Sequence, residues 1–228
     1  MKKLLIALAI VALASVAQAE VVASWTTTVF QNITEGSIVA TGGSYSFAME
    51  SAGGFAKGGT GGSAGTYCLA GASASNAAAA VAANQYMVFS WDDSYTLTLD
   101  SINGRYSRSG TGAQSAQWGI VDGGWTDIGS AVSIAMTGTP STSYTGVTTT
   151  FTNISGLKSG QLGVAFYGGT ASGNNAWARF DSRPSGTPVV ALSIEGTMVP
   201  VTPIPEPATM GLLGLGALAL ALRRKLSK

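Results

Sequence analysis

The sequence predicts an all-β domain folded as an antiparallel β-sandwich, with a signal peptide helix before it and a short hydrophobic helix after it. Between residues 20 and 199, short runs rich in β-branched and aromatic residues recur between Gly, Ser, Asn and Asp turns, which is typical of many short strands. No stretch there keeps the 3.6-residue period of an amphipathic helix for long. Tyr95, Leu97 and Leu99 alternate with polar residues instead. This pattern favours two packed sheets.

Local composition predicts the individual elements. We expect strands at residues 24–30, 86–91, 95–100, 103–107, 116–121, 147–151, 161–167, 176–181 and 189–196. The alanine-rich residues 77–83 predict two turns of helix, with Ser75 or Asn76 as the N-cap. Residues 53–65 hold seven glycines and are predicted to form a mobile loop. This loop lacks the Gly-Lys-Ser/Thr ending of a phosphate-binding loop.

Residues 1–19 predict a secretory signal peptide. Lys2 and Lys3 precede eleven apolar residues, and the small residues Ala17 and Ala19 follow. A positive start, an apolar centre and a small-x-small site are the three parts of such a peptide. We expect signal peptidase to cut after Ala19, which exports the rest of the chain.

The C-terminal end predicts a marginal membrane segment. Residues 200–207 form a proline-rich linker, and residues 208–228 contain a fifteen-residue uncharged run that ends before Arg223 and Arg224. A helix of that length spans ~22 Å, against ~30 Å for the hydrocarbon core of a membrane. The basic cluster would stay on the cytoplasmic side. The rest of the chain would then lie outside, in agreement with the signal peptide.

The order of features at this end resembles a known sorting signal. Pro205, Glu206 and Pro207 precede the Gly/Leu/Ala-rich run, and Arg223 and Arg224 follow it. This arrangement resembles the PEP-CTERM signal of exopolysaccharide-producing Gram-negative bacteria. The resemblance implies recognition by an exosortase in the inner membrane, removal of the tail, and delivery to the cell surface or the extracellular matrix. The alternative is a plain transmembrane helix with a proline-rich stalk.

The domain itself resembles the jelly-roll ectodomains often found upstream of such tails. The resemblance rests on the order of several short aromatic and glycine-rich motifs, at residues 86–90, 95–102, 106–112, 118–125, 166–169, 177–181 and 192–196. Those ectodomains are similar to lectins and carbohydrate-binding modules. The resemblance therefore implies a jelly roll and polysaccharide as a candidate partner.

Composition excludes several functions. Between residues 20 and 202 the chain carries six basic and ten acidic residues, a net charge of −4, so it has no electrostatic footprint for nucleic acid. The chain has no His and one Cys, which removes the commonest general base and a Cys-based zinc site. We expect the domain not to be an enzyme. Glycoside hydrolysis stays open, because it needs only two carboxylates.

Clustered carboxylates are the candidate metal ligands. Asp92, Asp122 and Asp127 could supply oxygen ligands to a structural Ca²⁺ together with backbone carbonyls and waters. Ordinary turn formation explains Asp at such positions equally well, because its side chain bonds the backbone two residues further on. We therefore expect no cofactor, with structural calcium as the alternative.

Three tryptophans are the candidate ligand contacts. Trp118, Trp125 and Trp177 could form an apolar platform on which a sugar ring stacks, although aromatic residues on strands more often belong to the core. The sequence as a whole predicts an exported, non-catalytic cell-surface or extracellular-matrix protein. A carbohydrate-binding module acting on exopolysaccharide and a glycoside hydrolase are the alternatives.

Overall fold

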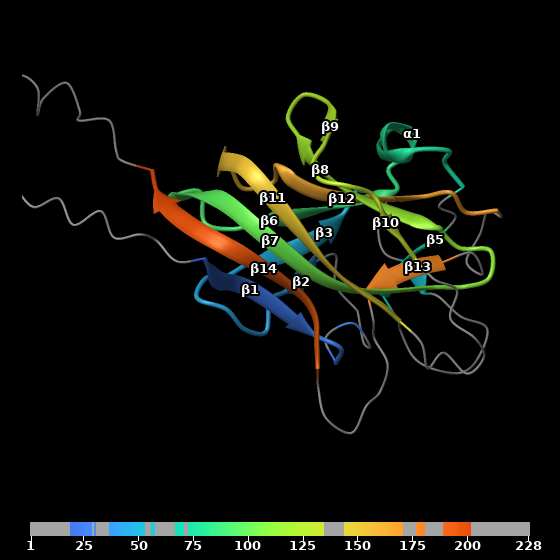
Figure 1. Cartoon of the computed structure of the whole chain (residues 1–228), viewed down its shortest axis with the longest axis horizontal. Coiled ribbons are helices and arrows are strands. Elements are labelled where there is room, and N and C mark those ends of the chain that lie inside the picture. Colours follow the sequence, from blue (N-terminus) through green and yellow to red (C-terminus); the bar gives the residue numbers. More distant parts are fainter. Residues whose placement is uncertain are drawn as a thin grey trace, which may run out of the picture.

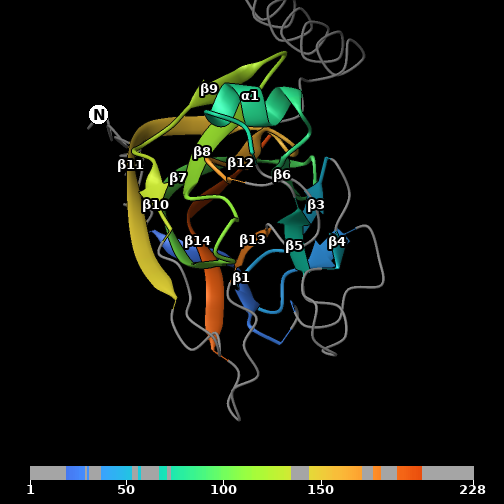
Figure 2. The same cartoon turned by 90° about the vertical axis from the view of Figure 1, so that its right-hand side faces the viewer.

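The computed structural model describes residues 19–28, 30, 37–52, 56–57, 67–70, 73–134, 144–170, 177–180 and 189–201. These residues form two antiparallel sheets that pack face to face (Figures 1 and 2). The predicted antiparallel β-sandwich is therefore confirmed. The two terminal helices predicted from the sequence fall outside the described residues, and within the described ranges no helix is long and apolar enough to cross a membrane.

The first sheet is built around one long strand, β7 (Tyr95–Arg108). One edge of β7 pairs with β14 (Val190–Pro200) and, at its end, with β13 (Trp177–Phe180). Beyond these lie β1 (Glu20–Thr26) next to β14, and β5 (Tyr67–Ala70) and β4 (Ala56–Lys57) next to β13. The other edge of β7 pairs with β11 (Thr145–Leu157).

The second sheet contains the remaining strands. Its order is β10 (Val132–Ser133), β8 (Ser115–Val121), β12 (Leu162–Tyr167), β6 (Tyr86–Ser90), β3 (Ala48–Ser51) and β2 (Ser37–Val39). The hairpin strand β9 (Trp125–Asp127) pairs with β8.

Several strands differ from their predictions. The two strands expected at 95–100 and 103–107 are one strand, because Ser101 continues the ladder by pairing with Glu195 and Thr150. The short strands β2, β3, β5, β9 and β10 were not predicted, since two to four residues carry no readable alternation. The strand β4 lies inside the segment predicted as a mobile glycine-rich loop, so that prediction is wrong at Ala56–Lys57.

The predicted helix is confirmed as α1 (Ala77–Ala82). Asn76 is its N-cap, with the side-chain Oδ1 accepting the backbone N–H of Ala79 at 2.9 Å. Ala77 and Ala80 are buried and pack with Ala165 of β12. The helix therefore covers part of the outer face of the second sheet.

Aromatic side chains from both sheets fill the core. Trp25 of β1 contacts Phe89 of β6 with ring centroids 5.6 Å apart, and Phe89 contacts Trp118 of β8 at the same distance. Phe180 of β13 lies against Trp118 and against Phe166 of β12, at 6.4 and 6.0 Å. All five rings are fully or almost fully buried. The contacts of Trp25 with Phe89, and of Phe180 with Trp118 and Phe166, cross between the sheets and hold them together.

Both ends of the described body lie at the same end of the sandwich (Figure 1). Glu20 pairs with Gly196, and β14 continues from there to Pro200. The backbone N–H of Val201 then donates to the carbonyl of Ser94 at 2.8 Å. The predicted cleavage site after Ala19 and the start of the C-terminal linker are thus neighbours at one pole of the domain.

Candidate functional site

A row of small polar residues crosses the outer face of the first sheet. In register, Ser24 of β1 pairs with Ser193 of β14, Ser193 pairs with Asn103 of β7, and Asn103 pairs with Thr148 of β11. Paired residues point to the same face of a sheet, and their chain neighbours, such as Trp25, point into the core. The row is therefore a continuous polar strip across four strands.

Hydrogen bonds fix the centre of this strip. The Asn103 amide nitrogen donates to Glu195 Oε1 at 2.7 Å and to Ser193 Oγ at 3.4 Å. The Ser101 hydroxyl donates to Glu195 Oε2 at 2.8 Å, and the Thr148 hydroxyl donates to Asn103 Oδ1. Hydrogen bonds to a carboxylate are stronger than those between neutral groups. The side chains of the strip are therefore held in one arrangement.

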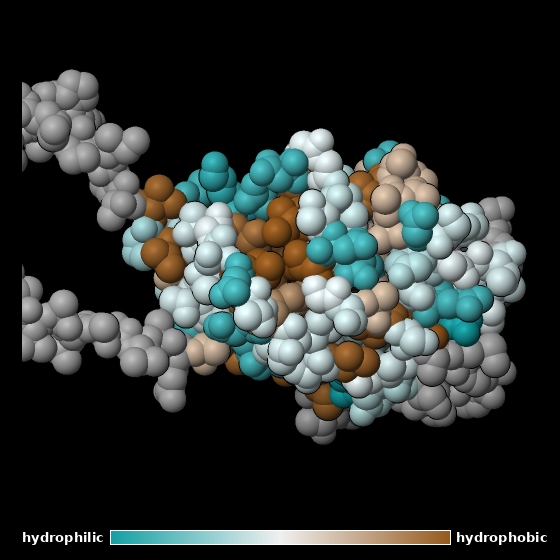
Figure 3. Space-filling model, turned by 45° about the horizontal axis from the view of Figure 1, so that its top comes forward, coloured by the Kyte–Doolittle hydropathy of each residue, from teal (hydrophilic) through white to brown (hydrophobic). Residues whose placement is uncertain are grey.

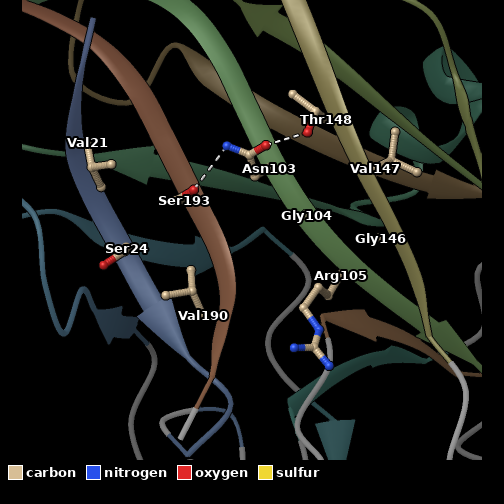
Figure 4. A pocket seen from close by; sticks show the side chains of 10 residues that line it. All are labelled: Val21, Ser24, Asn103, Gly104, Arg105, Gly146, Val147, Thr148, Val190 and Ser193. Atoms are coloured by element: carbon tan, nitrogen blue, oxygen red, sulfur yellow. Dashed lines mark hydrogen bonds between the residues drawn. The ribbon is translucent and has the colours of Figure 1, made fainter.

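This strip forms one wall of a groove of about 450 Å³ (Figure 4). Val21 of β1 and Val190 of β14 flank the Ser24 end of the strip and are 43% and 48% exposed. Arg105 lies at one end, with its guanidinium carbon 3.6 Å from the centre of the Tyr144 ring. The groove therefore offers hydroxyl and amide groups, an apolar side and a cation, a mixture that suits a ligand with both polar and apolar faces.

The groove lining contains no Asp or Glu. Glu195 of β14 lies beside Asn103 on the same face of the sheet and accepts hydrogen bonds from it and from Ser101. Acid and base catalysis of glycoside hydrolysis needs two facing carboxylates about 5–9.5 Å apart. The residues that line this groove do not include such a pair.

Sequence reasoning did not find this groove. Ser24, Asn103, Thr148 and Ser193 belong to four strands far apart in the chain, and each residue alone is unremarkable in a strand. The one local signal was Asn103, an amide at the first position of a predicted strand, and Asn is disfavoured in strands.

The structure places Trp118 in the core, so this residue cannot belong to an exposed platform. Its side chain is fully buried, and its Nε1–H donates to the Tyr106 hydroxyl at 3.0 Å. Tyr106 is also fully buried, and this burial raises the pKa of its hydroxyl, partly offset by the hydrogen bond from Trp118. The pair is an internal polar contact between the two sheets.

Trp125 lies on the outer face of the second sheet and is half-buried. Its ring covers Gly119 and Gly163, where an added Cβ would come within 2.3 and 3.1 Å of ring atoms. Its Nε1–H donates to Asp127 Oδ1 at 2.6 Å. Trp118 and Trp125 thus lie on opposite sides of one sheet and form no common platform. Trp177 belongs to β13, and its side chain is outside the described part of the structure.

The three candidate calcium ligands do not form one metal site. Among the described residues, no three His, Cys, Asp or Glu side chains form a group that could hold a metal ion, so Asp92, Asp122 and Asp127 do not share a site. Asp92 accepts the Ser94 backbone N–H at 2.8 Å, which is the predicted turn arrangement. Hydrogen bonds from the Ser94 side chain and backbone hold the pKa of Asp92 below its usual value. The Asp127 carboxylate accepts the hydrogen bond from Trp125 Nε1–H.

The sorting residues lie in a segment that family comparison identifies. Pro205, Glu206, Pro207, Arg223 and Arg224, like Ala17, fall outside the described residues. Residues 203–225 match the PEP-CTERM protein-sorting motif. No curated protein and no solved structure matches this chain. The predicted PEP-CTERM signal is thus confirmed, and it implies export through the inner membrane with exosortase as the processing partner.

Proposed function

We propose that the chain is a non-catalytic protein of the cell surface or extracellular matrix, whose jelly-roll-like sandwich acts as a binding and structural unit. The PEP-CTERM motif at residues 203–225 carries the export and sorting part of this proposal. The two processed ends support the rest. Both leave the sandwich at one pole, so a tail held in the membrane would present the opposite pole and both outer sheet faces to the surroundings.

The experiment compares the native protein with a variant in which Pro205, Glu206 and Pro207 are all replaced by Ala. We expect the native protein in the surface or matrix fraction without its C-terminal tail, and the variant in the membrane fraction with its tail. Replacing Val201 and Thr202 by Ala is the matched control, since it alters the same linker without touching residues 203–225. Equal processing of all three proteins would contradict the role of the motif.

The non-catalytic part of this proposal rests on which residue types are present. The chain has no His, and the groove lining has no carboxylate. A panel of polysaccharides incubated with the purified protein should show no new reducing ends. Turnover that one Asp→Asn or Glu→Gln replacement abolishes would make the protein a hydrolase instead. A structural Ca²⁺ remains the alternative to no cofactor, and calorimetric titration with Ca²⁺ tests it.

Carbohydrate binding is the second candidate function, and the groove on the first sheet favours it. Its hydroxyl and amide groups lie beside exposed valines, and sugars present hydroxyl edges beside apolar C–H faces. Filling the groove by Ser24→Trp should abolish binding on a glycan array. Thr126→Trp, at an exposed position of β9 in the other sheet, is the control and should leave binding unchanged. Equal binding by both variants would exclude this groove.

A further inference from the structure

The outer edge of β11 differs from the other long edge of the first sheet. At the opposite end of that sheet, residues 41–45 cover the edge of β1, with the Ser24 N–H donating to Gly42 at 2.7 Å and the Thr41 N–H donating to Ser24 at 2.8 Å. On β11, one edge pairs with β7, and within the described ranges no strand pairs with the other edge. Figure 2 shows β11 as the outermost strand on its side.

The first half of β11 has the properties of a strand that can accept a partner. Thr145 to Thr150 pair with β7 without interruption, whereas register shifts follow at Ile154 and Leu157. Asn153 and Gly156 have φ angles of 63° and 72° and mark this irregular second half. Proteins usually protect an edge strand with charges, Pro or bulges. Residues 145–157 contain no charged residue and no Pro. Of these protective features, the strand itself has only the register shifts of its second half.

A groove runs beside this regular half. It has a volume of about 460 Å³ and lies between residues 130–133 at the edge of the second sheet and residues 147–150 of β11. Val132 and Val147 contribute apolar surface to it. Figure 3, which brings the top of the view in Figure 1 forward, shows apolar residues gathered among hydrophilic ones in the middle of that face. The edge of β11 thus has open space along it.

We propose that residues 146–150 of β11 form an interface with a second copy of this chain, whose own β11 adds antiparallel to the edge and joins the two first sheets. In an antiparallel self-pairing the residue on the twofold axis faces its own counterpart, so a charge at that position would meet a like charge, which destabilises the pair. The neutral β11 avoids this penalty. With the twofold axis at Thr148, that residue faces its counterpart, Gly146 faces Thr150, and Val147 faces Thr149. Thr–Thr pairs across strands are favourable.

The antiparallel arrangement determines where the tails go. Strand β11 is antiparallel to β7, and β7 begins at the pole from which both chain ends leave. A twofold axis perpendicular to β11 therefore directs the two poles in opposite directions. Such a dimer joins copies on facing surfaces, or copies released from the membrane, rather than neighbours in one membrane. This consequence rests on the proposed surface location, whereas the pairing itself does not.

Sedimentation of the purified mature protein, from about 1 μM to about 1 mM, tests the pairing. We expect a concentration-dependent dimer. Thr148→Lys and Thr148→Glu should each weaken it by at least about tenfold, because identical charges then meet at the axis. Mixing the two variants should restore a dimer, which also shows that both are folded. Thr152→Lys, exposed beyond the regular half, is the control and should dimerise normally.

A monomer at every concentration would overturn the proposal. A dimer that both Thr148 variants retain would also overturn it, because the contact would then lie elsewhere. Neither result depends on export or tail removal, since both are read on purified protein. Failure of this inference is therefore distinguishable from failure of the proposed function.

Discussion

Removing one oxygen atom from the core should destabilise the sandwich, because it leaves a buried donor without its acceptor. In Tyr106→Phe, the Trp118 Nε1–H loses the hydroxyl that accepts its hydrogen bond at 3.0 Å. Both side chains are fully buried, so water cannot replace the lost acceptor without opening the core. An unsatisfied buried donor costs about 1–3 kcal/mol in the free energy of unfolding. For a domain of this size each kcal/mol lowers Tm by roughly 2–4 °C.

Urea unfolding followed by tryptophan fluorescence and far-UV circular dichroism measures this cost. Tyr45→Phe is the matched control, since it removes the same atom from a half-buried ring at the sandwich edge. The control should change the free energy of unfolding by less than about 0.5 kcal/mol. Equal losses in both variants, or no loss in Tyr106→Phe, would refute the assignment of this pair as a stabilising polar contact of the core.

Two further predictions concern a turn and a ring. Hydrogen bonds from Ser94 lower the pKa of Asp92 in the folded state. The ionised carboxylate of Asp92 therefore stabilises the fold. This stabilisation is fully present above the pKa of the unfolded state and is lost as the pH falls through the pKa of the folded state. The difference in urea midpoint between the native protein and Asp92→Asn should shrink on acidification below about pH 4, and a constant difference would contradict this. Gly119→Ala places a Cβ within 2.3 Å of the Trp125 ring and should lower the free energy of unfolding by about 1–3 kcal/mol, as measured by urea unfolding. Gly124→Ala is the control and should leave that free energy unchanged, because the position has open space around it.

Local signals in the sequence predicted the parts of the fold that depend on local chemistry. The alanine run after Asn76 contains both its helix formers and its cap, so α1 could be identified without tertiary information. The Asp92 turn is similar, because the carboxylate bonds a residue two positions away. The PEP-CTERM signal is a contiguous motif at residues 203–225 and needs no fold at all.

The groove and the position of Trp118 depend on register between distant strands, which no local pattern specifies. In β8, residues 116–119 are all buried, because the core lies on one side, and on the other Trp125 of β9 covers Gly119 and Gln117 bonds the carbonyls of Ile128 and Gly129. Without alternation, the sequence could not show which face Trp118 occupies. The polar strip of Ser24, Asn103, Thr148 and Ser193 appears only when four strands are aligned.

We expect this chain to be exported, to lose both ends and to remain at the surface or in the matrix. Intact mass spectrometry of the native protein, isolated from the surface and matrix fraction, measures which ends are present. We expect one species that begins at Glu20 and lacks Arg223 and Arg224. A species that still carries residues 1–19 would show that the signal peptide is not removed, and one that retains the basic tail would show that the C-terminal signal is not processed.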